Sequence, residues 1–235
     1  VAEKLLALRW RGVDPEPLLA RLQPLFGWLF SRFGVVLWIV LVSWAAALVA
    51  MRWDELWRKL PSAADWLAGS NVLWLALATI FVKTLHELGH ALMARRVGCR
   101  VQEIGVQLFF LLPCLYTNVS DVWLVPSKWR RIAVSAAGIY VELLLAAIAT
   151  LLWWRAEPGV FASLCLSVML VASLGTLILN GNPLMRYDGY YILSDLIEVP
   201  NLEQRSRTRL VAWLTQCCTG AERDVAGGLT RRWQP

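Results

Sequence analysis

Long apolar runs separated by shorter polar segments make up most of the chain. Four runs are long enough to cross a membrane as a helix: residues 34–51, 72–97, 132–154 and 160–179. Ionisable side chains are concentrated in the polar segments, apart from a few within the second and third runs. The pattern predicts an all-α polytopic membrane protein with about four transmembrane helices.

The segment between the second and third runs has a different period. Residues 100–108 alternate polar and apolar side chains, as a β-strand does, and Pro113 breaks any helix that would follow. Open strand edges are not tolerated in lipid, so these strands need shelter from the rest of the protein. We therefore expect a small membrane-associated β segment between spans two and three.

Composition divides the chain into three parts. Residues 1–33 form an N-terminal amphipathic segment, which would either lie along the membrane surface or pack on the protein as an ordinary helix. Residues 34–200 form the transmembrane core, and residues 201–235 predict a polar helix and a loose tail. Because the chain begins with Val rather than Met, we expect it to be a piece of a longer protein.

Hydrophobicity and charge fit a membrane protein and exclude a nucleic-acid binder. The chain is 58% hydrophobic and only 17% charged, and its net charge of +6 comes from basic residues spread over the polar segments. Lys and Arg number 5, 6 and 7 in residues 1–33, 95–131 and 186–235, against 3 and 1 in residues 52–71 and 155–159. The positive-inside rule then predicts that both termini of this chain are cytoplasmic.

The second apolar run contains the sequence His86-Glu87-Leu-Gly-His90. On a helix, both imidazoles project from one face about one turn apart, which suits two nitrogen ligands of one Zn²⁺. Glu87 beside them suits the general base that activates a zinc-bound water. The alternative is that the histidines pair or cap locally. Ionisable groups are costly inside a membrane span, so we favour the functional interpretation.

Two further acidic residues are candidates for the same site. Pro183 and two glycines interrupt any helix over residues 180–191, and irregular backbone at membrane depth lines cavities. Asp188 in this segment would supply an oxygen ligand or cap the next helix, and beside the histidines we favour the ligand. Glu142 inside the third run would either pair with Lys83 or orient substrate or metal, and we favour the pairing.

These residues resemble the site-2 protease family of intramembrane zinc metalloproteases. Its members carry H-E-x-x-H on one membrane helix and Asn-x-x-Pro…Asp-Gly at the end of a later span. The second motif is matched here by Asn180, Pro183, Asp188 and Gly189. Residues 182–191 look characteristic of a bacterial branch described as peptide zinc metalloproteases and found with export or secretion adaptors.

The resemblance implies an intramembrane zinc metalloprotease that hydrolyses peptide bonds of membrane-associated or exported peptides and proteins. Zn²⁺ would be bound by His86, His90 and Asp188, with Glu87 as the catalytic base. One departure concerns the substrate, because Glu142 stands where many members have an Asn proposed to contact the substrate backbone. Substrate binding or transition-state support would come from polar residues near the site: Lys83, Glu142 and Asn180.

The expected surroundings follow from the same resemblance. The protein would be integral to the bacterial inner membrane, with membrane lipid, a peptide or transmembrane protein substrate and an export or adaptor protein as its partners. The alternative is a non-proteolytic membrane component of a peptide or protein export system. The intact general base, Glu87, argues against this alternative because binding alone does not require one.

Metal content tests the predicted ligands directly. Detergent-purified wild type is expected to contain about one zinc per chain, and Asp188→Ala less, because the substitution removes the oxygen ligand. Mass spectrometry of the two proteins side by side measures this. Folded wild type that was never exposed to a chelator and contains no zinc would rule out the catalytic interpretation and favour an export scaffold.

Overall fold

The structure is a computed structural model, and it describes residues 9–60, 62, 69–109, 112–199, 202, 204, 206, 208, 209 and 211. The chain forms two compact units, residues 1–196 and 197–235. All the elements described below belong to the first unit. The predicted polar helix and tail over residues 201–235 lie mostly outside the described residues.

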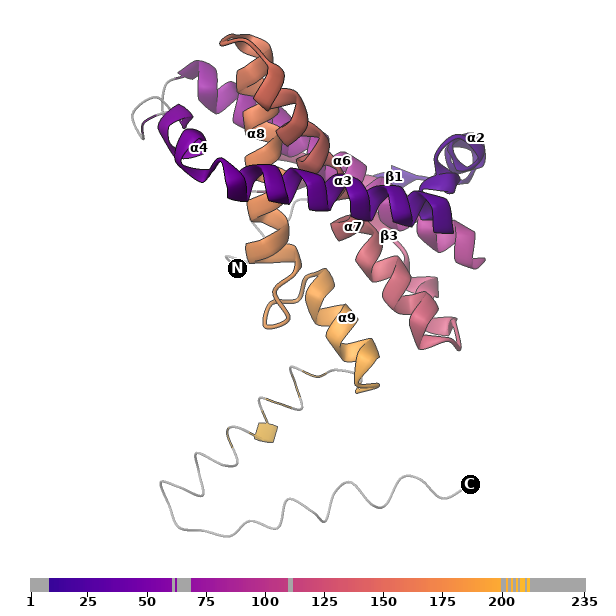
Figure 1. The fold of residues 1–235 in the computed structure, drawn as a ribbon. Coiled ribbons are helices and arrows are strands. Elements are labelled where there is room, and N and C mark those ends of the chain that lie inside the picture. Colours follow the sequence, from indigo (N-terminus) through magenta and orange to yellow (C-terminus); the bar gives the residue numbers. More distant parts are fainter. Residues whose placement is uncertain are drawn as a thin grey trace, which may run out of the picture. The chain divides into compact units, whose positions relative to one another are not determined.

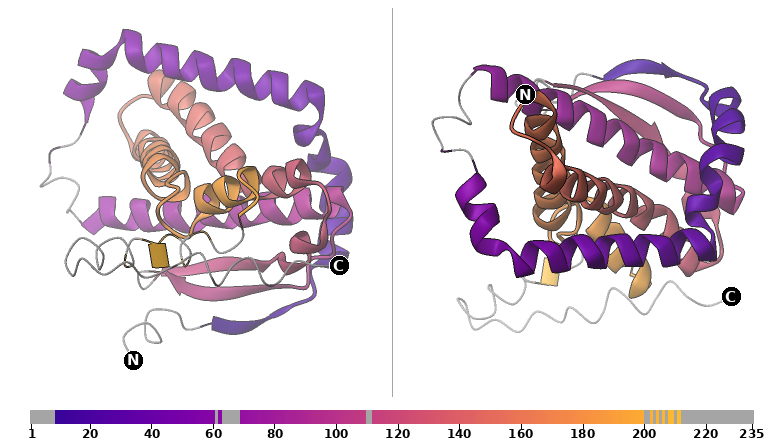
Figure 2. Two further views of the ribbon diagram at one scale, coloured as in Figure 1. Left: turned by 90° about the horizontal axis from the view of Figure 1, so that it is seen from below. Right: turned by 45° about the horizontal axis from the view of Figure 1, so that its top comes forward.

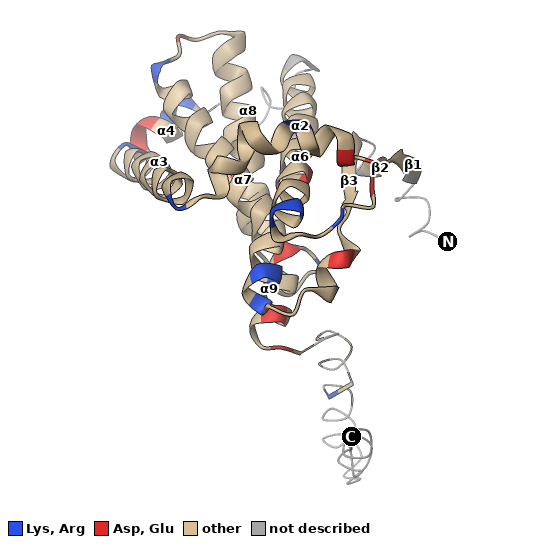
Figure 3. Cartoon of the chain, turned by 90° about the vertical axis from the view of Figure 1, so that its right-hand side faces the viewer, with Lys and Arg blue, Asp and Glu red and all other residues tan. Residues whose placement is uncertain are grey.

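Four helices of the described chain are long and apolar enough to cross a membrane (Figure 1). They are α3 (Arg32–Met51), α6 (Gly69–Val97), α7 (Lys128–Arg155) and α8 (Val160–Leu174) with its π-helical extension η3 (Gly175–Asn180). Their ends lie within a few residues of the predicted runs, and Figure 3 shows long stretches of these helices without charged residues. The all-α polytopic fold class is confirmed.

A three-stranded antiparallel sheet accompanies the helices, in the order β1 (Arg9–Val13), β2 (Glu103–Phe109) and β3 (Leu112–Asn118). Strands β2 and β3 form the β segment predicted between spans two and three. Strand β1 was not predicted, and it comes from the N-terminal segment. The sheet lies along one flank of α6 (Figure 2), where the Thr117 hydroxyl donates to the backbone carbonyl of Glu87 at 3.3 Å.

The N-terminal segment packs on the protein through one face of helix α2 (Glu16–Phe26) and the short helix η1 (Gly27–Phe30) that follows it. Leu19 of α2 is fully buried in a cluster with Ala91 and Leu92 of α6. Arg96 at the end of α6 donates to the carbonyl of Gly27 at 2.6 Å. Other apolar side chains of this segment are exposed: Leu18, Leu25, Phe26 and Trp28.

Helices α6 and α7 approach each other closely because small residues lie between them. A Cβ atom on Gly89 of α6 would lie 2.9 Å from Val141 Cγ2 and 3.0 Å from the carbonyl oxygen of Ala137 on α7. Small residues at helix contacts allow such backbone proximity in membranes, where dispersion packing replaces the hydrophobic effect between helices. Gly89 directly precedes His90, so this close contact places α7 next to the two histidines.

Helix α3 is docked on α7 through a polar aromatic pair. The Trp38 indole donates to the carbonyl of Tyr140 at 2.8 Å, and the two rings stack with centroids 5.0 Å apart. The Tyr140 hydroxyl donates back to the carbonyl of Leu29 at 2.7 Å, with the Gly34 carbonyl at 3.2 Å. The short helix α4 (Trp53–Lys59) follows α3.

Removing this hydroxyl should loosen the attachment of α3. Tyr140→Phe is expected to lower the free energy of unfolding by about 1 kcal/mol, because one hydrogen bond is lost and its acceptors are left without it. Equilibrium unfolding in mixed detergent and SDS micelles measures the change. Tyr191→Phe is the matched control, since Tyr191 is exposed on helix α9 (Asp188–Leu196), and an equal loss in both variants would contradict the docking role.

Candidate metal centre

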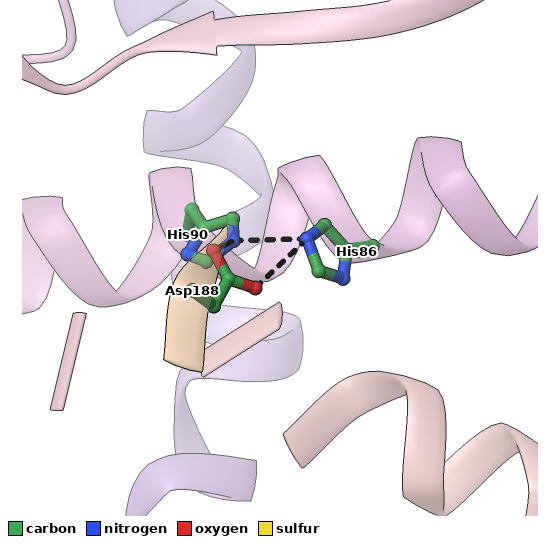
Figure 4. A group of neighbouring side chains, drawn as sticks. All are labelled: His86, His90 and Asp188. Atoms are coloured by element: carbon green, nitrogen blue, oxygen red, sulfur yellow. Dashed lines mark hydrogen bonds and ion pairs between the residues drawn. The ribbon is translucent and has the colours of Figure 1, made fainter. Parts of the chain in front are cut away.

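His86 and His90 lie one turn apart on the same face of α6, as the i, i+4 spacing predicts. Both residues are buried, and their rings meet edge to face with centroids 4.7 Å apart. Their Nε2 atoms point toward each other at a separation of 3.1 Å (Figure 4). Two ring nitrogens therefore converge on one small space.

Asp188 reaches that space from a different helix, α9. Its Oδ2 lies 3.2 Å from His86 Nε2, and its Oδ1 lies 3.4 Å from His90 Nε2. One ligand atom from each of these three residues lies within 4.8 Å of the others. Asp188 is also the first residue of helix α9. The two sequence interpretations of Asp188, helix start and neighbour of the histidines, are therefore compatible.

A very close backbone contact in the turn between η3 and α9 positions Asp188. The N–H of Gly181 donates to the carbonyl of Thr176 at 2.7 Å, which closes the π-helical turn. A Cβ atom on Gly189 would lie 2.6 Å from the carbonyl carbon and oxygen of Gly181, so only glycine fits. Farther along α9, Asp195 accepts a hydrogen bond of 2.6 Å from Arg131 of α7 and holds the helix there.

The groups that face the outer ring nitrogens favour one tautomer of each histidine. His90 Nδ1 lies 2.8 Å from the carbonyl oxygen of Val134, which can only accept, so this nitrogen carries the hydrogen. His86 Nδ1 lies 3.1 Å from Glu142 Oε1, which as a carboxylate also only accepts, although the two atoms are not aligned as a regular hydrogen bond. With the hydrogen on Nδ1 in both rings, the two Nε2 atoms have lone pairs that face each other and Asp188.

This arrangement fits a metal cation. Lone pairs of two nitrogens and a carboxylate converge in a buried space, and Asp188 Oδ2 is buried there without a hydrogen-bond partner among the described residues. Acceptors alone repel unless a proton or cation lies between them. Two histidines and one carboxylate are a ligand set of catalytic zinc.

Gly138 of α7 leaves the room that the centre needs. A Cβ atom there would lie 2.5 Å from His90 Nε2 and 2.6 Å from His86 Nε2, well inside van der Waals contact. The sequence predicted no role for Gly138, because that role depends on where α7 crosses α6. The same holds for Val134, which contributes only its backbone carbonyl.

A cavity of about 370 Å³ opens beside the centre, between α6, strand β3 and the turn before α9. Glu87 lines it and is only half-buried, so its side chain is accessible from the cavity. Lys83 and Asn180 line it as well, whereas Glu142 is fully buried behind them. The remaining lining comes mainly from the hairpin and the turn, including Gln107, Tyr116, Arg186 and Tyr187.

The residues with proposed supporting roles contact one another. Lys83 Nζ donates to Glu142 Oε1 at 2.7 Å, so the expected pairing of these two residues is present. Asn180 Nδ2 donates to Glu142 Oε2 at 2.6 Å, and the Thr176 hydroxyl donates to the same oxygen. Thr176 was not predicted, since a lone threonine in an apolar run carries no signal.

Comparison with known proteins points to peptidases. Residues 74–159 match the model of peptidase family M50. Over 145 residues the chain is 26% identical to the Bacillus subtilis (strain 168) protein named "Putative peptide zinc metalloprotease protein YydH", a match that covers 60% of this chain and 54% of that protein. The chain thus spans about half the length of this curated relative. No solved structure matches the chain.

Gly138 provides a test of the centre that leaves all three ligands in place. Gly138→Ala is expected to reduce zinc from about one per chain to a small fraction, because the new methyl group displaces both Nε2 atoms. Metal analysis of folded, detergent-purified protein measures this. Gly175→Ala is the control, because an added Cβ there meets nothing within 4 Å. Normal zinc in Gly138→Ala would show that the Nε2 atoms are not the ligands.

Proposed function

We propose, from the premise that the chain belongs to peptidase family M50, the site-2 protease family, that this integral membrane protein is a zinc metalloprotease. One observation carries the proposal. Two histidine nitrogens and a carboxylate oxygen converge within 4.8 Å of one another, beside a cavity that Glu87 lines. A structural role alone would not require that combination.

His86, His90 and Asp188 are the residues that would hold the metal. When bound, Zn²⁺ supplies Lewis-acid chemistry, polarising a carbonyl oxygen and making a water molecule more acidic. The protein holds the two imidazoles in the tautomer that directs Nε2 inward. Burial excludes bulk water from the ligands and strengthens every electrostatic interaction among them.

Glu87 is the proposed general base. It follows His86 directly in the sequence and lines the cavity beside the ligands, but it is not one of the three converging residues. In this role it takes a proton from the water that attacks the peptide carbonyl and gives it to the departing amine. The hydrogen bond from the Thr117 hydroxyl to the Glu87 carbonyl holds strand β3 next to Glu87.

The substrate we propose is a short extended stretch of a membrane-associated or exported peptide or protein. The carbonyls of an intact helix are hydrogen-bonded within it, so a transmembrane substrate must unwind locally before water attacks. A cavity of about 370 Å³ suits a few residues of extended chain better than a folded segment. The word "peptide" in the name of the Bacillus relative supports this class of substrate.

The proposed setting is the bacterial inner membrane, with both termini of this chain cytoplasmic. This orientation rests on the distribution of Lys and Arg along the sequence. An export or adaptor protein is the proposed partner, besides lipid and substrate. Exposed tryptophans on α4, Trp53 and Trp57, support an interfacial position for that helix.

Replacing the base should separate chemistry from metal binding. Glu87→Gln is expected to reduce peptide hydrolysis by about 10²–10⁴-fold while zinc content stays at the wild-type level, because Gln cannot accept the proton and Glu87 is not a ligand. Cleavage of a reporter substrate in proteoliposomes, with metal analysis of the same preparation, measures both. Glu55→Gln on α4 is the control, since Glu55 pairs only with Arg52 and Lys59 among the described residues.

Two results would contradict the proposal. Undiminished hydrolysis in Glu87→Gln would exclude Glu87 as the base. Peptide export that is equally efficient in the wild type and in Glu87→Gln, together with a wild type that cleaves nothing, would favour the non-proteolytic export component.

A further inference from the structure

Glu142 is a carboxylate placed deep inside a membrane span and fully buried there. Its two oxygens face four groups from other helices. Oε1 lies 2.7 Å from Lys83 Nζ and 3.1 Å from His86 Nδ1, while Oε2 accepts from Thr176 and Asn180. A buried ionised carboxylate is costly unless it is paired and hydrogen-bonded, and this one is fully surrounded by donors.

Neutralising Lys83 does not account for all of these contacts. One ammonium group already balances the charge of Glu142, and Oε1 could accept the hydrogen bond from Lys83 without lying close to His86. His86 Nδ1 lies against the same oxygen at ion-pair distance, although not aligned as a regular hydrogen bond. That nitrogen is buried and has no other partner among the described residues. Glu142 is therefore the acceptor that this nitrogen has available.

The position of Glu142 also excludes the direct roles considered for it. Its side chain is fully buried and does not line the cavity, so it does not reach a substrate. It is not among the three converging ligands either. What remains is an action on His86, whose Nε2 is on the far side of the ring and faces Asp188 at 3.2 Å.

We propose that Glu142 is a positioning residue, whose carboxylate fixes the Nδ1–H tautomer and the ring orientation of His86 and thereby strengthens metal binding. Histidine ligands of metals commonly donate their second ring N–H to a carboxylate or a carbonyl. Here the two anchors differ, because His90 uses the Val134 carbonyl and His86 uses Glu142. Lys83, Thr176 and Asn180 act one step farther out and keep the carboxylate in place. The inference rests on the proposed metal site.

A double variant separates positioning from charge balance. Glu142→Gln in the full chain is expected to weaken zinc binding by about 10–100-fold, because the amide orients His86 poorly. Lys83→Met combined with Glu142→Gln removes the unbalanced ammonium but does not restore the carboxylate, so its zinc affinity should remain low. Chelator competition on folded protein in detergent measures the dissociation constants. Recovery of wild-type affinity in the double variant would overturn the inference and leave Glu142 as a counter-ion.

A second readout reports the tautomer itself. His86 and His90 are the only histidines of the chain, so ¹⁵N-histidine labelling yields signals from these two rings alone. In the wild type both rings should show a single Nδ1–H tautomer, whereas Glu142→Gln should show exchange between tautomers for His86 and an unchanged His90. Unchanged signals from both rings would count against positioning.

The conservative variant keeps the test decisive if Glu142→Gln does not fold. Glu142→Asp preserves the charge but withdraws the oxygens by one methylene, so zinc binding should fall by about 10-fold while Lys83 stays neutralised. Wild-type affinity in Glu142→Asp would overturn the inference. A wild type that binds no zinc would overturn both proposals, and a wild type that binds zinc tightly but cleaves nothing would overturn the proposed function alone.

Discussion

Lone pairs that converge in a buried space are the constraint on which the rest of this structure depends. His86, His90 and Asp188 supply these lone pairs, and the two histidine rings have an acceptor facing Nδ1 on their outer side. In a region of low dielectric such acceptors repel one another strongly. A cation or a shared proton relieves that repulsion, and the rest of the fold holds the acceptors close enough to require it.

Helix α7 does most of this holding. Its Gly138 makes room for the two Nε2 atoms, and its Val134 and Glu142 anchor the two Nδ1 atoms. At its start, Arg131 ties down α9, the helix that carries Asp188. On another face, Tyr140 docks α3. A single helix that contributes none of the three candidate ligands therefore positions those that come from two other elements, α6 and α9.

The sequence predicted the spans and the candidate site for different reasons. Hydrophobic length alone determines which segments can cross a membrane, so the ends of α3, α6, α7 and α8 could be read closely. The Glu142–Lys83 pair was predictable because an acid and a base buried in neighbouring spans have few other partners. Strand β1, Gly138 and Thr176 were not predictable, since each acquires its role only when segments distant in the sequence meet.

The family match covers only part of the candidate metal centre. Residues 74–159 include both histidines, Glu87 and Glu142, which come from α6 and α7, but they do not include Asp188. The third candidate ligand, Asp188, is carried by α9, after a turn in which the backbones of Gly189 and Gly181 are in close contact. Metal affinity would then depend on two parts of the fold. The helix pair α6–α7 orients the two histidine nitrogens, and the glycine turn before α9 brings Asp188 into place to complete the site.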